Sequence, residues 1–76
     1  MKTYIEIQMA VDVEICISKE KHKPFNSSHE GYAVLLEELD EVWEEIKKSK
    51  NYTLSNEAKQ ELIQVAAVAM RMINEL

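Results

Sequence analysis

The sequence predicts an all-α protein, a single domain over residues 1–76 built from a three-helix antiparallel chain. In two long segments the apolar residues recur three and four positions apart, which is the period of a helix with one buried side. One glycine and one proline in the whole chain leave few turns, and few turns fit helices better than a sheet. A chain of 76 residues buries too little surface to be comfortably stable alone, so we expect copies to assemble into a dimeric or tetrameric helical bundle.

The first element has an ambiguous pattern. Between Ile5 and Ile17, apolar residues alternate with mostly polar ones, which taken alone predicts a strand. The rest of the chain offers only helical periods, however, and an unpaired strand of that length would promote aggregation. We therefore expect a helix over about residues 3–21. Its inner face would consist of Ile5, Met9, Val13, Cys16 and Ile17.

A basic connector with the sequence KEKHKPFN follows at residues 19–26. Pro24 prevents the residue before it from continuing a helix. The lysines and His22 of this segment either contact phosphate groups or balance the charge of the acidic helix that follows. Phe25 is expected to anchor the connector on the bundle.

The clearest helix is predicted over residues 28–49. Ser27 followed three residues later by Glu30 has the pattern of a capping box, in which the two residues satisfy each other's backbone amides. Lysines near the end of the segment suit the negative pole of a helix dipole. The buried stripe is expected to contain Tyr32, Leu35, Leu36, Leu39, Val42, Trp43 and Ile46.

Six acidic residues lie within nine positions of this second helix, and they fall into two groups. Glu37, Asp40 and Glu44 point away from the apolar stripe, as a solvated face would. Glu38 borders the stripe, and Glu41 lies close behind it. Carboxylates three positions apart project side by side and supply the hard oxygen ligands that Mg²⁺ prefers, so we expect this pair to hold a cation.

A third helix is predicted over residues 56–75, with Ser55 as its N-cap. It is apolar almost all round, and such a helix is buried on more than one side. The second helix would cover one side, and the first helix or another copy of the chain would cover the other. Its polar side is defined by Gln60, Arg71 and Asn74.

Glu61 lies in the apolar stripe of the third helix, where a carboxylate needs a partner. It either reaches out to solvent, pairs with a lysine of the connector, or shares a site with the acids of the second helix. Counting about 1.5 Å per residue from the intervening turn puts Glu41 and Gln64 each about 12 Å from that turn. Glu38, Glu41, Glu61 and Gln64 are therefore expected to line one oxygen-rich pocket between two helices, where bundles commonly build metal sites.

Composition and charge argue against several classes of partner. A net charge of −5 does not suit a nucleic-acid polymer, which requires a basic surface. No apolar run is long enough to span a membrane. The single Cys16 cannot form an internal disulfide, and the N-terminal residues lack the apolar core of a signal peptide, so we expect a cytoplasmic protein.

The acidic motifs of the two helices resemble those of the MazG-like, all-α nucleoside triphosphate pyrophosphohydrolases. That family is marked by EExxE on one helix and ExxD on the next. The run Glu37-Glu38-Leu39-Asp40-Glu41 matches the first motif completely, and Glu61-Leu62-Ile63-Gln64 matches the second except at its last position. The resemblance extends over roughly residues 22–76.

The resemblance implies a Mg²⁺-dependent hydrolase, with Mn²⁺ as a possible substitute, that cleaves a nucleoside triphosphate into a monophosphate and pyrophosphate. Family members build their bundle from two or four copies of the chain. By analogy Glu38, Glu41 and Glu61 would hold the metal ion, which would neutralise and polarise the triphosphate. Glu37 or Glu41 would accept a proton from the attacking water.

Two departures from the family pattern define an alternative. Gln64 stands where the family has an aspartate, so one ligand is neutral and Gln64→Asp is expected to tighten Mg²⁺ binding. The chain also ends at Leu76, without the further helix that many relatives use to hold phosphates. The alternative function is a catalytically weakened helical module that binds a nucleotide or a protein partner.

Overall fold

The computed structural model describes residues 3–76, and the chain is all-α there, with three helices and no strand in the described part. Helix α1 comprises Tyr4–Lys21, α2 comprises Ser28–Lys48 and α3 comprises Asn56–Glu75. Each helix begins and ends within one residue of the bounds expected from the sequence. The prediction of an all-α chain with three helices is thus confirmed.

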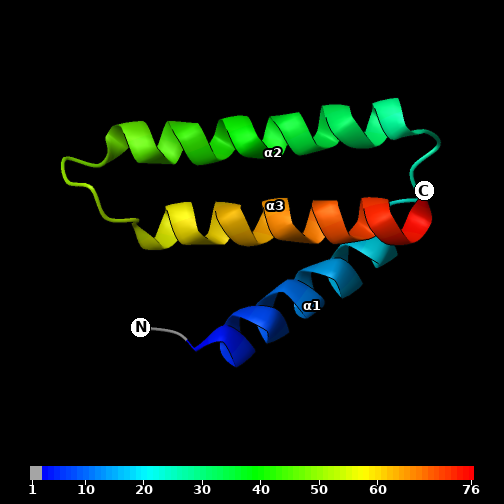
Figure 1. The fold of residues 1–76 in the computed structure, drawn as a ribbon, viewed down its shortest axis with the longest axis horizontal. Coiled ribbons are helices and arrows are strands. Elements are labelled where there is room, and N and C mark those ends of the chain that lie inside the picture. The colour runs from blue at the N-terminus through cyan, green and yellow to red at the C-terminus, as the bar shows by residue number, and fades with distance from the viewer. Residues whose placement is uncertain (1–2) are drawn as a thin grey trace.

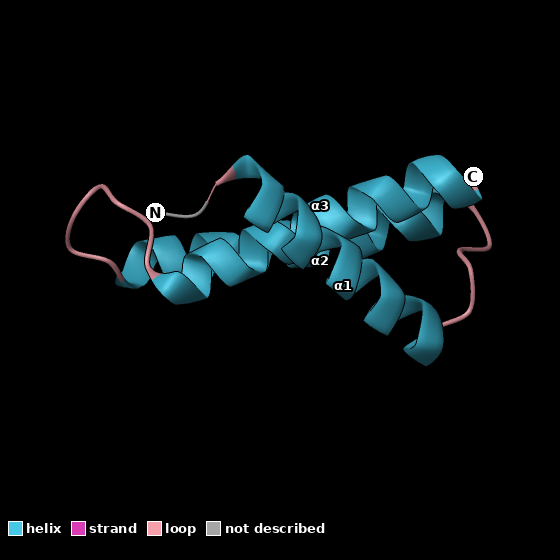
Figure 2. Ribbon diagram, turned by 90° about the horizontal axis from the view of Figure 1, so that it is seen from below, coloured by secondary structure: helices cyan, strands magenta, loops and turns pink. Residues whose placement is uncertain are grey.

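Helix α3 is the centre of the molecule. It lies antiparallel beside α2, and α1 crosses it obliquely on another side (Figure 1). Helices α1 and α2 each pack against α3 but not against each other. Seen after a quarter turn, the three helices do not form a closed bundle, because α1 diverges from the pair (Figure 2).

Helix α1 buries a different face from the one that the sequence pattern suggested. Val11 is its buried residue, and it packs with Ile63 and Ala67 of α3, while Ala10 and Ile15 border this contact. The expected inner face is wrong, because its members are exposed to solvent: Ile5, Met9, Val13, Cys16 and Ile17. Alternation places apolar side chains all around a helix, so it left the contact face undetermined.

The helix starts predicted for α2 and α3 are confirmed, with one change. The hydroxyl of Ser27 accepts from the backbone N–H of Glu30 at 3.1 Å, and Ser55 accepts from Ala58 at 3.0 Å. The carboxylate of Glu30, however, accepts from the backbone N–H of Asn26 at 3.1 Å instead of that of Ser27. The reciprocal half of the capping box therefore reaches one residue further back.

Small side chains let α2 and α3 approach closely at both ends. Ala58 is buried at the first turn of α3. At the other end, a Cβ atom added to Gly31 would lie only 3.0 Å from the side chain of Met72, so a larger residue there would push Met72 aside. Val42 and Val68 fill the interior between these two positions.

The connector between α1 and α2 is fastened to the end of α3 by Arg71. This residue was expected on the polar side of α3, but only 4% of it is exposed, so that expectation is wrong. Its guanidinium donates to both carboxylate oxygens of Glu75, at 2.8 and 3.2 Å, and to the hydroxyl of Ser18 at 2.6 Å. The ring of Phe25 lies 4.4 Å from the guanidinium carbon, which confirms Phe25 as the anchor of the connector. Arg71, Glu75, Ser18 and Phe25 are called the Arg71 cluster below.

The exposed surface of α2 carries a long apolar stripe. Only six apolar side chains of the described residues are buried. No large side chain among the described residues is less than 2% exposed. Of the seven residues expected to be buried on α2, Val42 is buried and Leu35 is half-buried, as expected. The other five are exposed, at alternate spacings of four and three residues, and form the exposed stripe of α2: Tyr32, Leu36, Leu39, Trp43 and Ile46. No helix of the described residues is sufficiently long and apolar to cross a membrane.

Candidate metal centre

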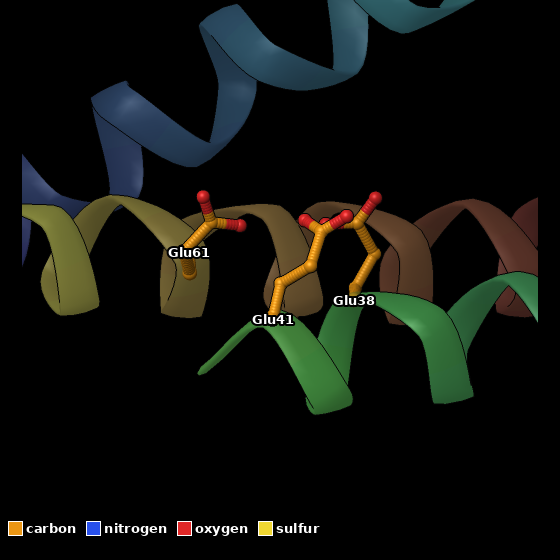
Figure 3. Close-up of side chains that lie close together, drawn as sticks. All are labelled: Glu38, Glu41 and Glu61. Atoms are coloured by element: carbon orange, nitrogen blue, oxygen red, sulfur yellow. The ribbon is translucent and has the colours of Figure 1, made fainter. Parts of the chain in front are cut away.

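Three carboxylates from two helices meet between α2 and α3. Glu38 and Glu41 project from α2, Glu61 projects from α3, and one carboxylate oxygen of each lies within 4.8 Å of the others (Figure 3). These three residues are called the carboxylate cluster. Glu61 is therefore neither turned outward nor paired with a connector lysine. Glu38 and Glu61 are half-buried, whereas Glu41 is exposed.

Helix geometry explains why these side chains meet. Positions three apart on α2 lie on the same side of a helix with 3.6 residues per turn, so Glu38 and Glu41 leave α2 in similar directions. Antiparallel pairing places Glu61 at the same level on α3, as the count from the turn predicted. In Figure 3 the three side chains extend from α2 and α3 towards the side on which α1 lies.

The cluster holds like charges together without a balancing cation among the described residues. Burial raises the pKa of Glu38, and the neighbouring charge of Glu41 raises it further. Burial also raises the pKa of Glu61, again with a contribution from the carboxyl group of Glu41. The ion pairs of the described chain lie elsewhere: Lys47 with Glu44, Lys48 with Glu45, and Arg71 with Glu75.

The structure adds one carboxylate that the sequence reading missed. Glu14 of α1 accepts from the amide nitrogen of Gln64 at 2.9 Å and from that of Gln60 at 3.3 Å. Its charge also contributes to the raised pKa of Glu38, so α1 brings a fourth acid to the edge of the cluster. A signal was present in the sequence, because Val11, Glu14 and Ser18 follow one another at spacings of three and four. The incorrect inner face of α1 concealed it.

The other acids of α2 lie outside the carboxylate cluster. Glu37, Asp40 and Glu44 are exposed, which confirms the solvated face predicted for them. Glu37 is a predicted catalytic base, yet it leaves the helix about 100° away from the adjacent Glu38. Its catalytic role stays a prediction, as does the role of Gln64 as a metal ligand.

The donor set of the cluster fits a hard divalent cation. Carboxylate oxygens are the ligands that Mg²⁺ prefers, and Mg²⁺ usually keeps several waters beside one or two protein carboxylates. Such an ion would relieve the repulsion that Glu41 exerts on Glu38 and Glu61, which contributes to the raised pKa of both. Protons and a cation therefore compete for the same oxygens.

A cavity of about 720 Å³ lies elsewhere, between α1 and the first turns of α3. Its walls are mostly apolar and include Ile7 and Val11 of α1, Leu54 of the turn and Ile63 of α3. None of the three clustered carboxylates lines it. The carboxylate cluster and this cavity are thus separate features of the molecule.

We compared the chain with known protein families, curated proteins and solved structures. The chain matches no family model, and no curated protein or solved structure is significantly similar to it. A functional assignment must therefore come from the residues and their geometry.

Proposed function

We propose that this chain is a Mg²⁺-dependent nucleoside triphosphate pyrophosphohydrolase of the MazG-like type. The observation that carries the proposal is the meeting of Glu38, Glu41 and Glu61, which come from two helices and have no cationic partner among the described residues. These residues occupy the positions that the motif resemblance assigns to the metal ion. Like charges gathered in this way cost stability unless a ligand offsets the repulsion.

In this proposal the residues of the site serve as metal ligands or as the proton acceptor. Glu38, Glu41 and Glu61 hold Mg²⁺, which neutralises charge on the triphosphate when it is bound. The amide nitrogen of Gln64 is engaged by Glu14, so only its carbonyl oxygen remains for the ion or for a water. Glu37 or the exposed Glu41 accepts a proton from the attacking water. The oxygen of that water adds to the phosphoanhydride, which is cleaved into a monophosphate and pyrophosphate.

The direct test measures pyrophosphate release from a panel of nucleoside triphosphates, with and without Mg²⁺. The proposal expects activity that requires Mg²⁺ and is lost in Glu38→Gln and in Glu61→Gln. Asp40→Asn is the matched control, because it removes the same charge from an exposed position of the same helix. Activity that persists in both glutamine variants would remove the proposed site.

The alternative is a weakened module that binds a nucleotide or a protein partner without turnover. One observation favours it, namely that the neutral Gln64 gives its nitrogen to Glu14 instead of adding a second acid from α3, beside Glu61, to the site. A nucleotide that binds in the presence of Mg²⁺, with no pyrophosphate release, would support this reading. It would leave the metal site intact and remove the catalytic assignment.

We also propose that the chain associates with itself through the exposed stripe of α2. The accessible surface of the chain is 6054 Å², whereas a folded monomer of this size exposes about 4,800 Å². The difference, about 1,300 Å², lies within the area of roughly 1,000–2,500 Å² that each chain buries in an obligate homodimer. The stripe lies on the side of α2 opposite Glu41, so association there leaves the carboxylate cluster accessible.

Analytical ultracentrifugation tests this part of the proposal. The wild-type chain is expected to sediment as a dimer or tetramer, and Leu39→Glu is expected to convert it to a monomer. Tyr52→Ser is the control, because Tyr52 is fully exposed in the turn before α3, away from the stripe. A monomeric wild-type chain at high concentration would contradict self-association.

A further inference from the structure

Helix α1 is held on α3 by a narrow set of contacts. Its apolar contact is centred on Val11, while the N-terminal half of the helix exposes large side chains such as Tyr4, Ile5 and Met9. Its side-chain hydrogen bonds to α3 are made by Glu14 and Ser18. A single helix of this length is only marginally stable in water, so α1 depends on these contacts for its structure.

The carboxylate of Glu14 accepts two hydrogen bonds from side chains of α3. One oxygen of its carboxylate accepts from Gln60 at 3.3 Å, and the other accepts from Gln64 at 2.9 Å. Gln60 and Gln64 are four residues apart, so they project from the same side of α3 one turn after another. Both Glu14 and Gln64 are half-buried, where a hydrogen bond to a charged group is stronger than at the open surface.

The chemistry of this contact fixes which residues can make it. An ionised carboxylate only accepts hydrogen bonds, so each glutamine must present its NH₂ group to Glu14. An aspartate at position 64 would instead place a second acceptor, with the same charge, against Glu14. The neutral residue at position 64 and the acid at position 14 are therefore complementary.

We propose that Gln60 and Gln64 form a latch with Glu14 that docks α1 beside the carboxylate cluster, and that Gln64 is a positioning residue for α1. Gln64→Asp would then release the N-terminal half of α1 before it could benefit an ion site. The inference does not depend on the proposed hydrolysis, since the latch consists of hydrogen bonds among three side chains of the chain itself.

Hydrogen exchange of backbone amides in the metal-free chain tests the latch. Gln64→Asp is expected to accelerate exchange about tenfold over residues 8–13 of α1, because it removes a hydrogen bond to a charged group. Residues near Ser18 remain fastened by Arg71 and are expected to exchange as in the wild type, as are α2 and α3. Asn74→Asp is the control, because it also replaces a side-chain amide by a carboxylate, at an exposed position of α3.

The reversed pair gives the decisive variant. In Glu14→Gln combined with Gln64→Glu, which exchanges the two side chains at their original lengths, the new amide at position 14 donates to the acid at position 64 while its oxygen still accepts from Gln60. This double variant is expected to restore the wild-type exchange rates of residues 8–13. Should Gln64→Asp fail to fold, Glu14→Ala tests the same contact without adding a charge.

Two outcomes would overturn the latch. One is an exchange rate over residues 8–13 that is unchanged in both Gln64→Asp and Glu14→Ala, and the other is a reversed pair that does not restore protection. Neither outcome affects the proposed hydrolysis, which is judged by pyrophosphate release from the wild-type chain. Conversely, an inactive wild-type chain with an intact latch would remove the hydrolase and leave this inference standing.

Discussion

Two groups of charged residues lie on α3, and they are built in opposite ways. In the Arg71 cluster, the guanidinium donates to both oxygens of Glu75, and the backbone N–H of Phe25 donates to the same carboxylate at 2.9 Å. Only 4% of the Arg71 side chain and 8% of the Glu75 side chain are exposed, so the pair is balanced within the protein. In the carboxylate cluster, Glu38, Glu41 and Glu61 come together with no cation among the described residues.

This difference separates structure from candidate function. A buried charge with its partners in place holds elements together, and the Arg71 cluster does so for α1, the connector and α3. Carboxylates that lie close together without a cation destabilise the fold, because the negative charge of each one opposes the ionisation of its neighbours. Glu38, Glu41 and Glu61 lie half-buried or exposed at the edge of the α2–α3 contact, and their mutual repulsion is what the proposed Mg²⁺ would offset.

The largest effect is expected from breaking the balanced group. Arg71→Ala would leave Glu75 buried without its counter-charge, and loss of one partner of a buried pair costs about 3–5 kcal/mol. Denaturant unfolding measures this loss. Lys47→Ala is the control, because its pair with Glu44 is exposed to solvent and contributes little to stability. A loss for Arg71→Ala as small as that of the control would contradict the structural role of Arg71.

Neutralising one acid of the carboxylate cluster is expected to have the opposite sign. In the presence of a chelator, Glu61→Gln removes a repulsive charge and should raise the free energy of unfolding by a few tenths of a kcal/mol. The same substitution at Glu75 should lower it, since that carboxylate accepts from Arg71 and Phe25. Denaturant unfolding of the two variants, measured side by side, compares their free energies of unfolding. Destabilisation of both would show that the carboxylate cluster is not repulsive.

The two groups also predict opposite dependences on pH. The pKa values of Glu38 and Glu61 are raised, so between the ordinary and the raised value the folded chain binds more protons than the unfolded chain. The free energy of unfolding in chelator should therefore fall as pH rises through that window. Hydrogen bonds from Arg71 hold the pKa of Glu75 below its ordinary value, and its contribution is lost as pH falls through that lowered pKa.

Unfolding curves recorded over the acidic range test these signs with two variants. Glu61→Gln should weaken the fall of stability with rising pH, and Glu75→Gln should weaken its fall with decreasing pH. Identical pH profiles for the two variants would mean that the titrations belong to other groups.

The features that the sequence predicted are those encoded by neighbours along the chain. Hydroxyl caps at Ser27 and Ser55 mark helix starts, and the three-residue spacing of Glu38 and Glu41 fixes their common side. The position of Glu61 along α3, beside Glu38 and Glu41 of α2, followed from the rise per residue and from the short turn between the two helices. Local geometry was sufficient for these features because an antiparallel pair joined by a short turn has little freedom.

The features that the sequence did not predict depend on which faces meet across the chain. The alternating residues of α1 offer several apolar faces of similar strength, so nothing local selects Val11 over Val13. Arg71 was predicted on the polar side of α3, because the sequence does not show that Phe25 and Glu75 surround it. The contacts of Glu14 with Gln60 and Gln64 depend on how α1 packs on α3, which the sequence pattern did not determine. The exposed stripe of α2, in turn, follows from α1 packing on α3 and not on α2.

Titration of the wild-type chain with Mn²⁺, followed by electron paramagnetic resonance of the unbound ion, tests whether the carboxylate cluster binds a divalent cation. Saturable binding of Mn²⁺ is expected, competed by Mg²⁺, lost in Glu61→Gln and retained in Asp40→Asn. Binding that is absent in the wild type, or equal in these two variants, would show that Glu38, Glu41 and Glu61 do not form a metal centre.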